Sequence, residues 1–101
     1  MDTANSRMTT STCSVLAAFL RSPGAELYGK QIMQLTGISS GTLYPILRRQ
    51  VERGCLTLRL EGREESNGDR PLRKYYRLTS EGEELARRVR LVLPELLDQE
   101  N

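Results

Sequence analysis

The sequence predicts a mainly α-helical fold with one small β-hairpin and a long last helix. Apolar residues recur at helical spacing in three stretches before Gly54 and again after Thr79, whereas between these points they alternate with polar residues. The chain has 101 residues, which suits one small hydrophobic core. It contains no run of about 18 apolar residues and no apolar N-terminal segment typical of a signal peptide. We therefore expect a soluble, cytoplasmic protein.

The first helix should follow a polar tail. Residues 1–10 are polar and aperiodic, so we expect them to be flexible. Ser11 or Thr12 is the predicted N-cap, and the sequence Ser-Pro-Gly at 22–24 should end the helix. Its apolar face consists of Val15, Leu16, Phe19 and Leu20.

A second helix is predicted from Glu26 to Thr36, because Tyr28, Ile32 and Leu35 recur at i, i+4 and i+7. Gly37 is a natural residue just past a helix end. Only a few residues separate this helix from the third helical stretch. Two helices joined by so short a turn are typical of a helix-turn-helix, whose second helix enters the major groove of DNA.

The third stretch, residues 38–49, reads I-S-S-G-T-L-Y-P-I-L-R-R. Helical geometry puts Leu43, Ile46 and Leu47 on one face of this helix. Arg48 and Arg49 fall on the opposite face. The pattern predicts a helix that packs through its apolar side and meets a partner through its basic side.

The start of this third helix combines capping residues with a proline. The hydroxyls of Ser39 and Ser40 could cap the first free backbone N–H groups, and those N–H groups also attract a phosphate. Pro45 lacks the N–H that a helix beginning at Gly41 would need, and its ring would clash one turn back. We therefore expect the regular helix to begin nearer Tyr44.

After Gly54 the pattern predicts a β-hairpin. Leu56, Leu58 and Leu60 alternate with Thr57, Arg59 and Glu61, which indicates a half-buried strand over 56–61. Turn-forming residues follow, and alternation in K-Y-Y-R-L at 74–78 indicates a second strand. A basic hairpin directly after such a helix is the wing of a winged helix-turn-helix. Arg70, Arg73 and Lys74 are placed to reach the DNA backbone or minor groove. The alternative is a solvated charged hairpin that touches no DNA.

The last helix is predicted from Thr79 to Leu97, with Thr79 or Ser80 as its cap and Glu83 at capping-box spacing from Ser80. It would span about 28 Å, which is longer than one small core requires, and Pro94 should kink or break it. The long apolar stripe predicts a C-terminal dimerisation helix. The alternative is a helix that folds back on its own domain.

Charge is unevenly distributed along the chain. The net charge is +2 overall, with +1 in residues 1–38, +4 in residues 39–77 and −3 in residues 78–101. Positive charge therefore gathers in the third helix and the hairpin, whereas the acidic end should stay away from phosphate. A chance fluctuation in a chain with 28% charged residues is the alternative explanation.

The sequence predicts no metal site, cofactor or catalytic centre. The chain has no His, and Cys13 and Cys55 are too far apart to suggest a zinc motif. Cys55 lies at an apolar junction, which favours a small buried thiol over a redox sensor. Neither a carboxylate dyad nor a Gly-rich phosphate loop is evident, so we expect no enzymatic activity.

Three sequence blocks occur in order with sensible gaps: Y-G-K-Q-I at 28–32, G-I-S-S-G-T-L-Y-P-I-L-R-R at 37–49, and D-R-P-L-R-K-Y-Y-R-L-T at 69–79. Together they resemble the PadR family of bacterial transcription regulators, over roughly residues 15–97. Many members of that family have a shorter wing of the G-G-R-P-R type. The wing tip here is extended and carries Glu64, Glu65 and Asp69.

The resemblance implies a sequence-specific DNA-binding regulator, most often a repressor, that acts as a homodimer on an inverted repeat of double-stranded DNA. It also implies a possible small-molecule effector of unknown identity. The chain would divide into a tail (1–10), a winged helix-turn-helix DNA-binding domain (11–79) and a C-terminal dimerisation helix (80–101). The alternative function is a winged-helix module that binds a protein of the transcription machinery.

Two sets of residues carry these expectations. The predicted DNA contacts are Lys30, Ser39, Ser40, Thr42, Tyr44, Arg48, Arg49, Arg70, Arg73 and Lys74. The predicted dimer interface consists of Leu16, Phe19, Leu85, Val89, Val92, Leu93, Leu96 and Leu97.

Overall fold

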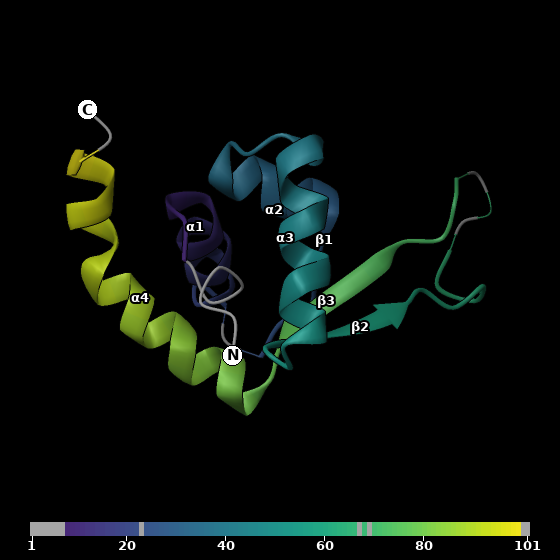
Figure 1. The fold of residues 1–101 in the computed structure, drawn as a ribbon. Helices are drawn as coiled ribbons and strands as arrows, with labels where there is room; N and C mark the ends of the chain where they lie inside the picture. The colour runs from purple at the N-terminus through teal and green to yellow at the C-terminus, as the bar shows by residue number, and fades with distance from the viewer. Residues whose placement is uncertain (1–7, 23, 67, 69, 100–101) are drawn as a thin grey trace.

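The computed structural model of the chain describes residues 8–22, 24–66, 68 and 70–99. Its elements are, in order, α1 (Thr10–Phe19), β1 (Leu27–Tyr28), α2 (Gly29–Thr36), α3 (Ser40–Glu52), β2 (Leu56–Leu60), β3 (Lys74–Leu78) and α4 (Ser80–Gln99). The strands form one antiparallel sheet in the order β1-β3-β2. The predicted mainly helical fold with a β-hairpin is confirmed, and the sheet contains one strand more than expected (Figure 1).

α1 begins earlier than predicted. Its N-cap is Thr9, whose hydroxyl accepts a hydrogen bond from the backbone N–H of Thr12 at 3.1 Å. The prediction of Ser11 or Thr12 as the cap was wrong, because the run T-T-S-T at 9–12 offers a hydroxyl at every position and the first one is used. Thr10, which was assigned to the flexible tail, is helical. Residues 1–7 of that tail lie outside the described residues.

β1 replaces the start of the predicted second helix. Leu27 pairs with Tyr76 of β3 and Tyr28 pairs with Tyr75, so that α2 begins only at Gly29. The prediction of a helix from Glu26 was wrong because local periodicity does not reveal pairing with a distant strand. α2 ends at Gly37 as predicted, where a φ of 75° suits glycine.

α3 runs through Pro45 without interruption, from Ser40 to Glu52. The expectation that the regular helix begins near Tyr44 was wrong. Pro45 cannot donate a hydrogen bond to the carbonyl of Gly41, but Gly41 is exposed, so water can solvate that carbonyl. A Cβ at Gly41 would meet no atom within 4 Å, which shows that this turn is not crowded.

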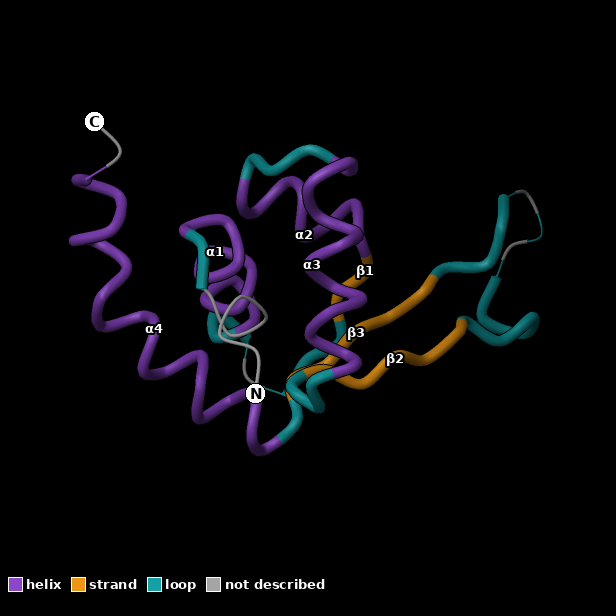
Figure 2. The backbone as a smooth tube through the Cα atoms, in the orientation of Figure 1, coloured by secondary structure: helices purple, strands orange, loops and turns teal. Residues whose placement is uncertain are grey.

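β3 has the predicted boundaries, whereas β2 ends at Leu60, one residue before the predicted Glu61. The expectation of a half-buried first strand holds only for Leu56, because Leu58 and Leu60 are exposed. β2 and β3 pair in antiparallel register from Leu56 opposite Leu78 to Leu60 opposite Lys74. Tyr76 faces the core, where it is 5% exposed, whereas Arg77 is exposed on the other side. The strands and the loop at their far end project away from the helices (Figure 2).

α4 is a single helix that continues past Pro94 and changes direction along its length (Figure 1). Thr79 is its cap, because its hydroxyl accepts a hydrogen bond from the N–H of Gly82 at 2.9 Å. The capping box predicted for Ser80 and Glu83 does not form, since Ser80 is already the first helical residue. The Thr79 hydroxyl also donates to the carbonyl of Gly54 at 2.6 Å, which ties α4 to the end of α3.

Two clusters of buried side chains hold these elements together. The larger one joins α1, α2, α3 and the sheet and contains Val15, Phe19, Ile32, Leu43, Ile46, Leu47, Leu56 and Tyr76. The smaller one joins α1 to α4 and contains Cys13, Leu16, Leu20, Ala86 and Val89. Both cysteines are buried free thiols, as predicted for Cys55, and burial raises the pKa of each.

The residues predicted at a dimer interface fall into three groups. Leu16, Phe19 and Val89 are at most 7% exposed, so in this conformation they pack within one chain and offer little surface to another. Leu85 and Leu93 are half-buried against α1, and Val92 is 45% exposed. The side chains of Leu96 and Leu97 lie outside the described residues. α4 thus packs on its own domain and still presents an exposed apolar strip, which includes Leu91 at 77% exposure.

Candidate nucleic-acid interface

The outer face of α3 is polar and accessible. Leu43, Ile46 and Leu47 are buried as predicted, whereas the six predicted DNA-contacting residues of this segment are all exposed: Ser39, Ser40, Thr42, Tyr44, Arg48 and Arg49. The first residues of α3 present backbone N–H groups that precede its first intrahelical hydrogen bonds. Ser39 is the N-cap residue, but its hydroxyl makes no capping hydrogen bond.

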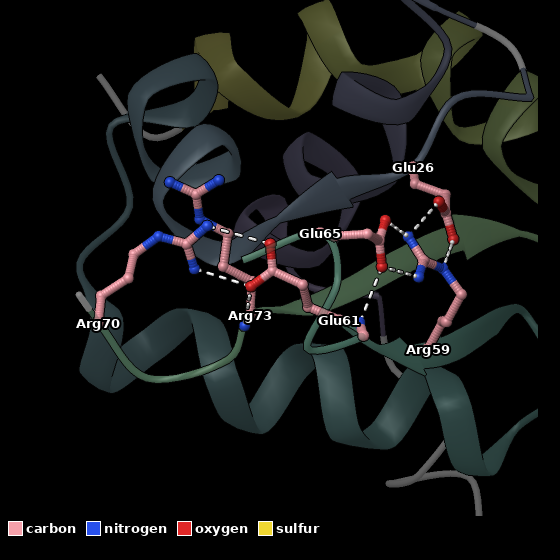
Figure 3. A network of polar contacts seen from close by, with 7 residues as sticks. Glu26, Arg59, Glu61, Glu65, Arg70 and Arg73 are labelled. Atoms are coloured by element: carbon pink, nitrogen blue, oxygen red, sulfur yellow. Dashed lines mark hydrogen bonds and ion pairs between the residues drawn. The ribbon is translucent and has the colours of Figure 1, made fainter. Parts of the chain in front are cut away.

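The wing is fastened at its base by a buried carboxylate. Glu61 is 3% exposed and accepts two hydrogen bonds from the guanidinium of Arg70, at 2.8 and 3.0 Å, and one from the backbone N–H of Arg73 at 3.0 Å. These bonds, with Arg70 contributing most, lower the pKa of Glu61 to about 2. The Arg70 side chain predicted to reach DNA is therefore already held by the protein (Figure 3).

A second network connects the wing loop to the segment before β1. Arg59 donates to Glu26 at 2.8 and 2.9 Å and to Glu65 at 2.9 and 3.4 Å (Figure 3). Glu65 also accepts from the N–H of Gly62 at 2.8 Å. The hydrogen bonds from Arg59 lower the pKa of both carboxyl groups. The carboxylate of Glu65, in the extended wing tip, is thus paired with Arg59 and does not present an unpaired negative charge.

Aromatic rings link the two networks across the sheet. The guanidinium carbon of Arg73 lies 4.1 Å from the centre of the Tyr28 ring, and that of Arg59 lies 4.9 Å from the centre of the Tyr75 ring. The two rings meet edge to face, with centres 5.6 Å apart. Cation–π contacts of this kind restrict an arginine while leaving its N–H groups free to donate.

A hollow of about 500 Å³ lies between the start of α2, the ring of Tyr44 and the segment that leads into β3. It is lined by Tyr28, Gly29, Lys30, Met33, Tyr44, Arg70, Leu72, Arg73 and Lys74. Tyr44 reaches this position only because residue 29 is glycine: a Cβ there would overlap the Tyr44 hydroxyl and lie 2.8 Å from the adjacent ring carbon.

The hollow brings together five of the ten predicted DNA-contacting residues, namely Lys30, Tyr44, Arg70, Arg73 and Lys74. The other five lie elsewhere on α3 or just before it and do not line the hollow. Sequence reasoning did not assign Gly29, Met33 or Leu72 to the site. The only signal for Gly29 was its place in the block Y-G-K-Q-I, because its close approach to Tyr44 cannot be read from periodicity.

Neither a metal-binding cluster nor a membrane-spanning helix occurs among the described residues. They contain no group of three or more His, Cys, Asp or Glu side chains placed to hold a metal ion. In the same part of the chain, no helix is long and apolar enough to cross a membrane.

Three solved structures illustrate what the chain resembles. A PadR family transcriptional regulator from Eggerthella lenta is 28% identical, with a TM-score of 0.61 and coverage of 85% of this chain and 77% of that one. A PadR-like transcription factor from Bacteroides fragilis is 25% identical, with a TM-score of 0.64 and coverage of 97% and 95%. The PcaV transcriptional regulator from Streptomyces coelicolor, in complex with its natural ligand, is 24% identical with a TM-score of 0.64; the match covers 84% of this chain and 55% of PcaV.

Sequence comparison gives the same family. No curated protein sequence matches the chain significantly. The sequence model described as "Transcriptional regulator PadR-like family" matches residues 16–88, which include α2, α3, the hairpin and the first half of α4. The chain therefore belongs to the PadR-like family of transcriptional regulators, which are DNA-binding winged-helix proteins and not enzymes.

Proposed function

We propose that this chain is a repressor that binds an inverted repeat as a homodimer, with α3 in the major groove and the wing against the flanking backbone. The observation that carries the proposal is the exposed basic face of α3 beside a cationic hollow. A role on DNA implies a cytoplasmic location. Residues 11–79 would form the DNA-binding domain and residues 80–101 the dimerisation helix.

In this proposal α3 reads bases and its surroundings hold phosphates. Arg48 and Arg49 are exposed on the C-terminal half of α3, and each guanidinium can donate two hydrogen bonds to a guanine edge, worth about 1–3 kcal/mol of discrimination. Ser39, Ser40 and Thr42 would contact phosphates or base edges at the groove wall. The guanidinium of Arg70 already donates two hydrogen bonds to Glu61. Arg70 would therefore mainly stabilise the wing and would not be a primary DNA contact.

The exposed strip of α4 would form the dimer interface. Leu91 and Val92 are exposed and Leu93 is half-buried, so this part of the helix can pack against a second copy while Val89 holds it to α1. A two-fold dimer would place the two copies of α3 about 34–36 Å apart, one turn of the DNA helix. Analytical ultracentrifugation at micromolar concentration tests this, and a monomer would contradict the dimer.

A small-molecule effector would act between α1 and α4. The supporting observations are the solved complex of PcaV with its natural ligand and a second hollow of about 280 Å³ in this chain. That hollow is lined by Ser14, Ala17, Ala18, Arg21, Leu35, Thr36 and Leu93. Because α4 would also carry the dimer interface, an occupant there would change the spacing of the two α3 helices.

Selection of bound sequences from a random DNA pool tests the function most directly. The proposal predicts a palindromic motif with half-sites about one helical turn apart. Affinity should fall about 10³- to 10⁵-fold between 50 and 200 mM salt if the dimer neutralises roughly six to ten phosphates. Recovery of no motif, together with co-purification of a protein of the transcription machinery, would instead favour the protein-binding alternative.

Two substitutions separate base readout from backbone contact. Arg48→Ala should reduce the preference for the operator over random DNA, whereas Lys74→Ala should weaken binding to both alike. Equal losses on both DNAs for both variants would remove base readout from α3. A reporter gene placed behind the selected operator then tests repression, since expression should rise when the regulator is deleted.

A further inference from the structure

The hollow beside Tyr44 has the charge of an anion site. Lys30 from α2 and Arg73 and Lys74 from the hairpin all line it, and no carboxylate does. Among the ion pairs of the described residues, none involves these three cations. The nearby carboxylates are already occupied, because Glu61 holds Arg70 and Glu65 holds Arg59. The hollow therefore keeps an uncompensated positive charge that a bound anion would neutralise.

One of the three cations is held in place before any ligand arrives. The backbone of Arg73 is fixed on both sides by Glu61, since its N–H donates to the Glu61 carboxylate at 3.0 Å and its carbonyl accepts from the Glu61 N–H at 2.7 Å. The guanidinium then rests on the Tyr28 ring. Because the arginine has lost much of its freedom in advance, binding an anion there costs less conformational entropy.

Neutral groups complete the hollow. The start of α2 carries the partial positive charge of a helix N-terminus, and the N–H of Tyr28 is already taken by the side-chain oxygen of Gln31 at 3.0 Å. The Tyr44 hydroxyl lies over Gly29 and can donate to an oxygen in the hollow. Met33 and Leu72 supply apolar walls, which suit the carbon atoms of a deoxyribose.

We propose that this hollow seats one backbone phosphate of duplex DNA, contacted jointly by Lys30, Arg73, Lys74 and the Tyr44 hydroxyl. Tyr44 belongs both to the hollow and to the exposed face of α3, so a phosphate held here lies on the strand that borders the groove entered by α3. This inference rests on the proposed function. It adds that the three cations contact one and the same phosphate, and not three different phosphates.

Salt dependence measures how many phosphates a set of cations neutralises. Each phosphate contact contributes about 0.9 to the slope of log affinity against log salt concentration. The variant Lys30→Gln/Arg73→Gln/Lys74→Gln should therefore lose about 0.9 of slope per chain, whereas three separate contacts would cost about 2.7. The matched control, Arg87→Gln/Arg88→Gln/Arg90→Gln, removes three exposed charges that do not line the hollow and should leave the slope unchanged.

Fluorescence anisotropy with labelled duplexes of random sequence gives these slopes without requiring an operator. If selection yields no motif, the proposed sequence-specific function is wrong. The slopes still show whether the three cations share one phosphate. Circular dichroism checks that each variant is folded. Should the triple variant unfold, Lys30→Gln/Lys74→Gln changes only two exposed side chains and should lose about 0.6 per chain, two thirds of the roughly 0.9 from the shared phosphate. The shared seat is overturned if the slope falls by about 2.7 per chain in the triple variant or by about 1.8 in the double variant. It is also overturned if the slope falls no more than it does in the control.

An operator, once selected, allows the phosphate to be located. Each backbone phosphate is replaced in turn by an uncharged methylphosphonate, and the wild type is compared with Lys30→Gln/Lys74→Gln. At one position in each half-site the difference between the two proteins should disappear, because the partner of both lysines is already neutral there. If the difference persists at every position, the shared phosphate does not exist.

Discussion

Two glycines inside helices should respond in opposite directions to the same substitution by alanine. Gly82 lies in the first turn of α4, against the backbone of Cys55. A Cβ there would overlap the carbonyl oxygen of Cys55 and lie 2.8 Å from its carbonyl carbon and 3.0 Å from its Cα. Gly41 lies in the first turn of α3, and a Cβ there would meet nothing within 4 Å.

The magnitudes follow from what each site can accommodate. In Gly82→Ala the obstructing atoms are backbone, so α4 must move away from Cys55, and overpacking of this kind costs about 1–3 kcal/mol. The movement also strains the bonds from Thr79 to the carbonyls of Cys55 (3.0 Å) and Gly54 (2.6 Å), each worth about 1 kcal/mol. If both bonds are lost, and after the gain of about 1 kcal/mol from alanine in a helix, the net loss is about 2–4 kcal/mol. Gly41→Ala should instead gain about 0.5–1 kcal/mol.

Thermal unfolding followed by circular dichroism at one fixed protein concentration compares the two variants, since a dimer makes the midpoint depend on concentration. For a domain of this size Gly82→Ala should lower Tm by about 8–32 °C, whereas Gly41→Ala should raise it by a few degrees. If Gly82→Ala is neutral or stabilising, α4 does not pack against Cys55 as described. If Gly41→Ala destabilises as much as Gly82→Ala, the space around the Cβ does not decide the effect.

Three other predictions concern the wing base, the cap of α4 and its exposed strip. The stability that Glu61 contributes should be complete above about pH 4.5 and disappear as the pH falls toward 2, its pKa in the fold. In urea unfolding, the difference in free energy of unfolding between the wild type and Glu61→Gln should therefore shrink over this range. A difference that does not change with pH would contradict the prediction. Thr79→Ala should cost about 1–2 kcal/mol in urea unfolding through loss of the cap, and no change would deny its capping role. Leu91→Glu should shift the sedimentation of the protein toward the monomer without loss of helix content, and an unchanged dimer would place Leu91 outside the interface.

Features that depend on local spacing could be predicted from the sequence. The alternation in 74–78 predicted β3 to the residue, and that in 56–61 predicted β2 to within one residue. The inward positions of Leu43, Ile46 and Leu47 followed from helical geometry alone. Helical spacing succeeds in α3 because the core selects the residues on one face, whereas in β2 Leu58 and Leu60 are exposed, so alternation there marks a strand without a fully buried face.

Features that depend on a distant partner could not be predicted in this way. Tyr28 fits a helical spacing, but pairing with β3 makes it part of a strand. Arg70 reads as a free wing cation, yet the buried carboxylate of Glu61 binds it. The fit of Tyr44 over Gly29 depends on how α2 and α3 cross, which no single stretch of sequence encodes. The features of the candidate site that the sequence did not predict are therefore contacts between different helices and strands.

The bonds from Thr79 to the carbonyls of Gly54 and Cys55, the residues that follow α3, make α4 a lever arm for the recognition surface. A helix of 20 residues is about 30 Å long, so a tilt of about 6° at its base displaces its far end by about 3 Å. One base-pair step in DNA is about 3.4 Å. In a dimer joined through α4, a tilt of this size, with Val89 and Leu93 repacking against α1, would thus alter half-site spacing by about one base pair.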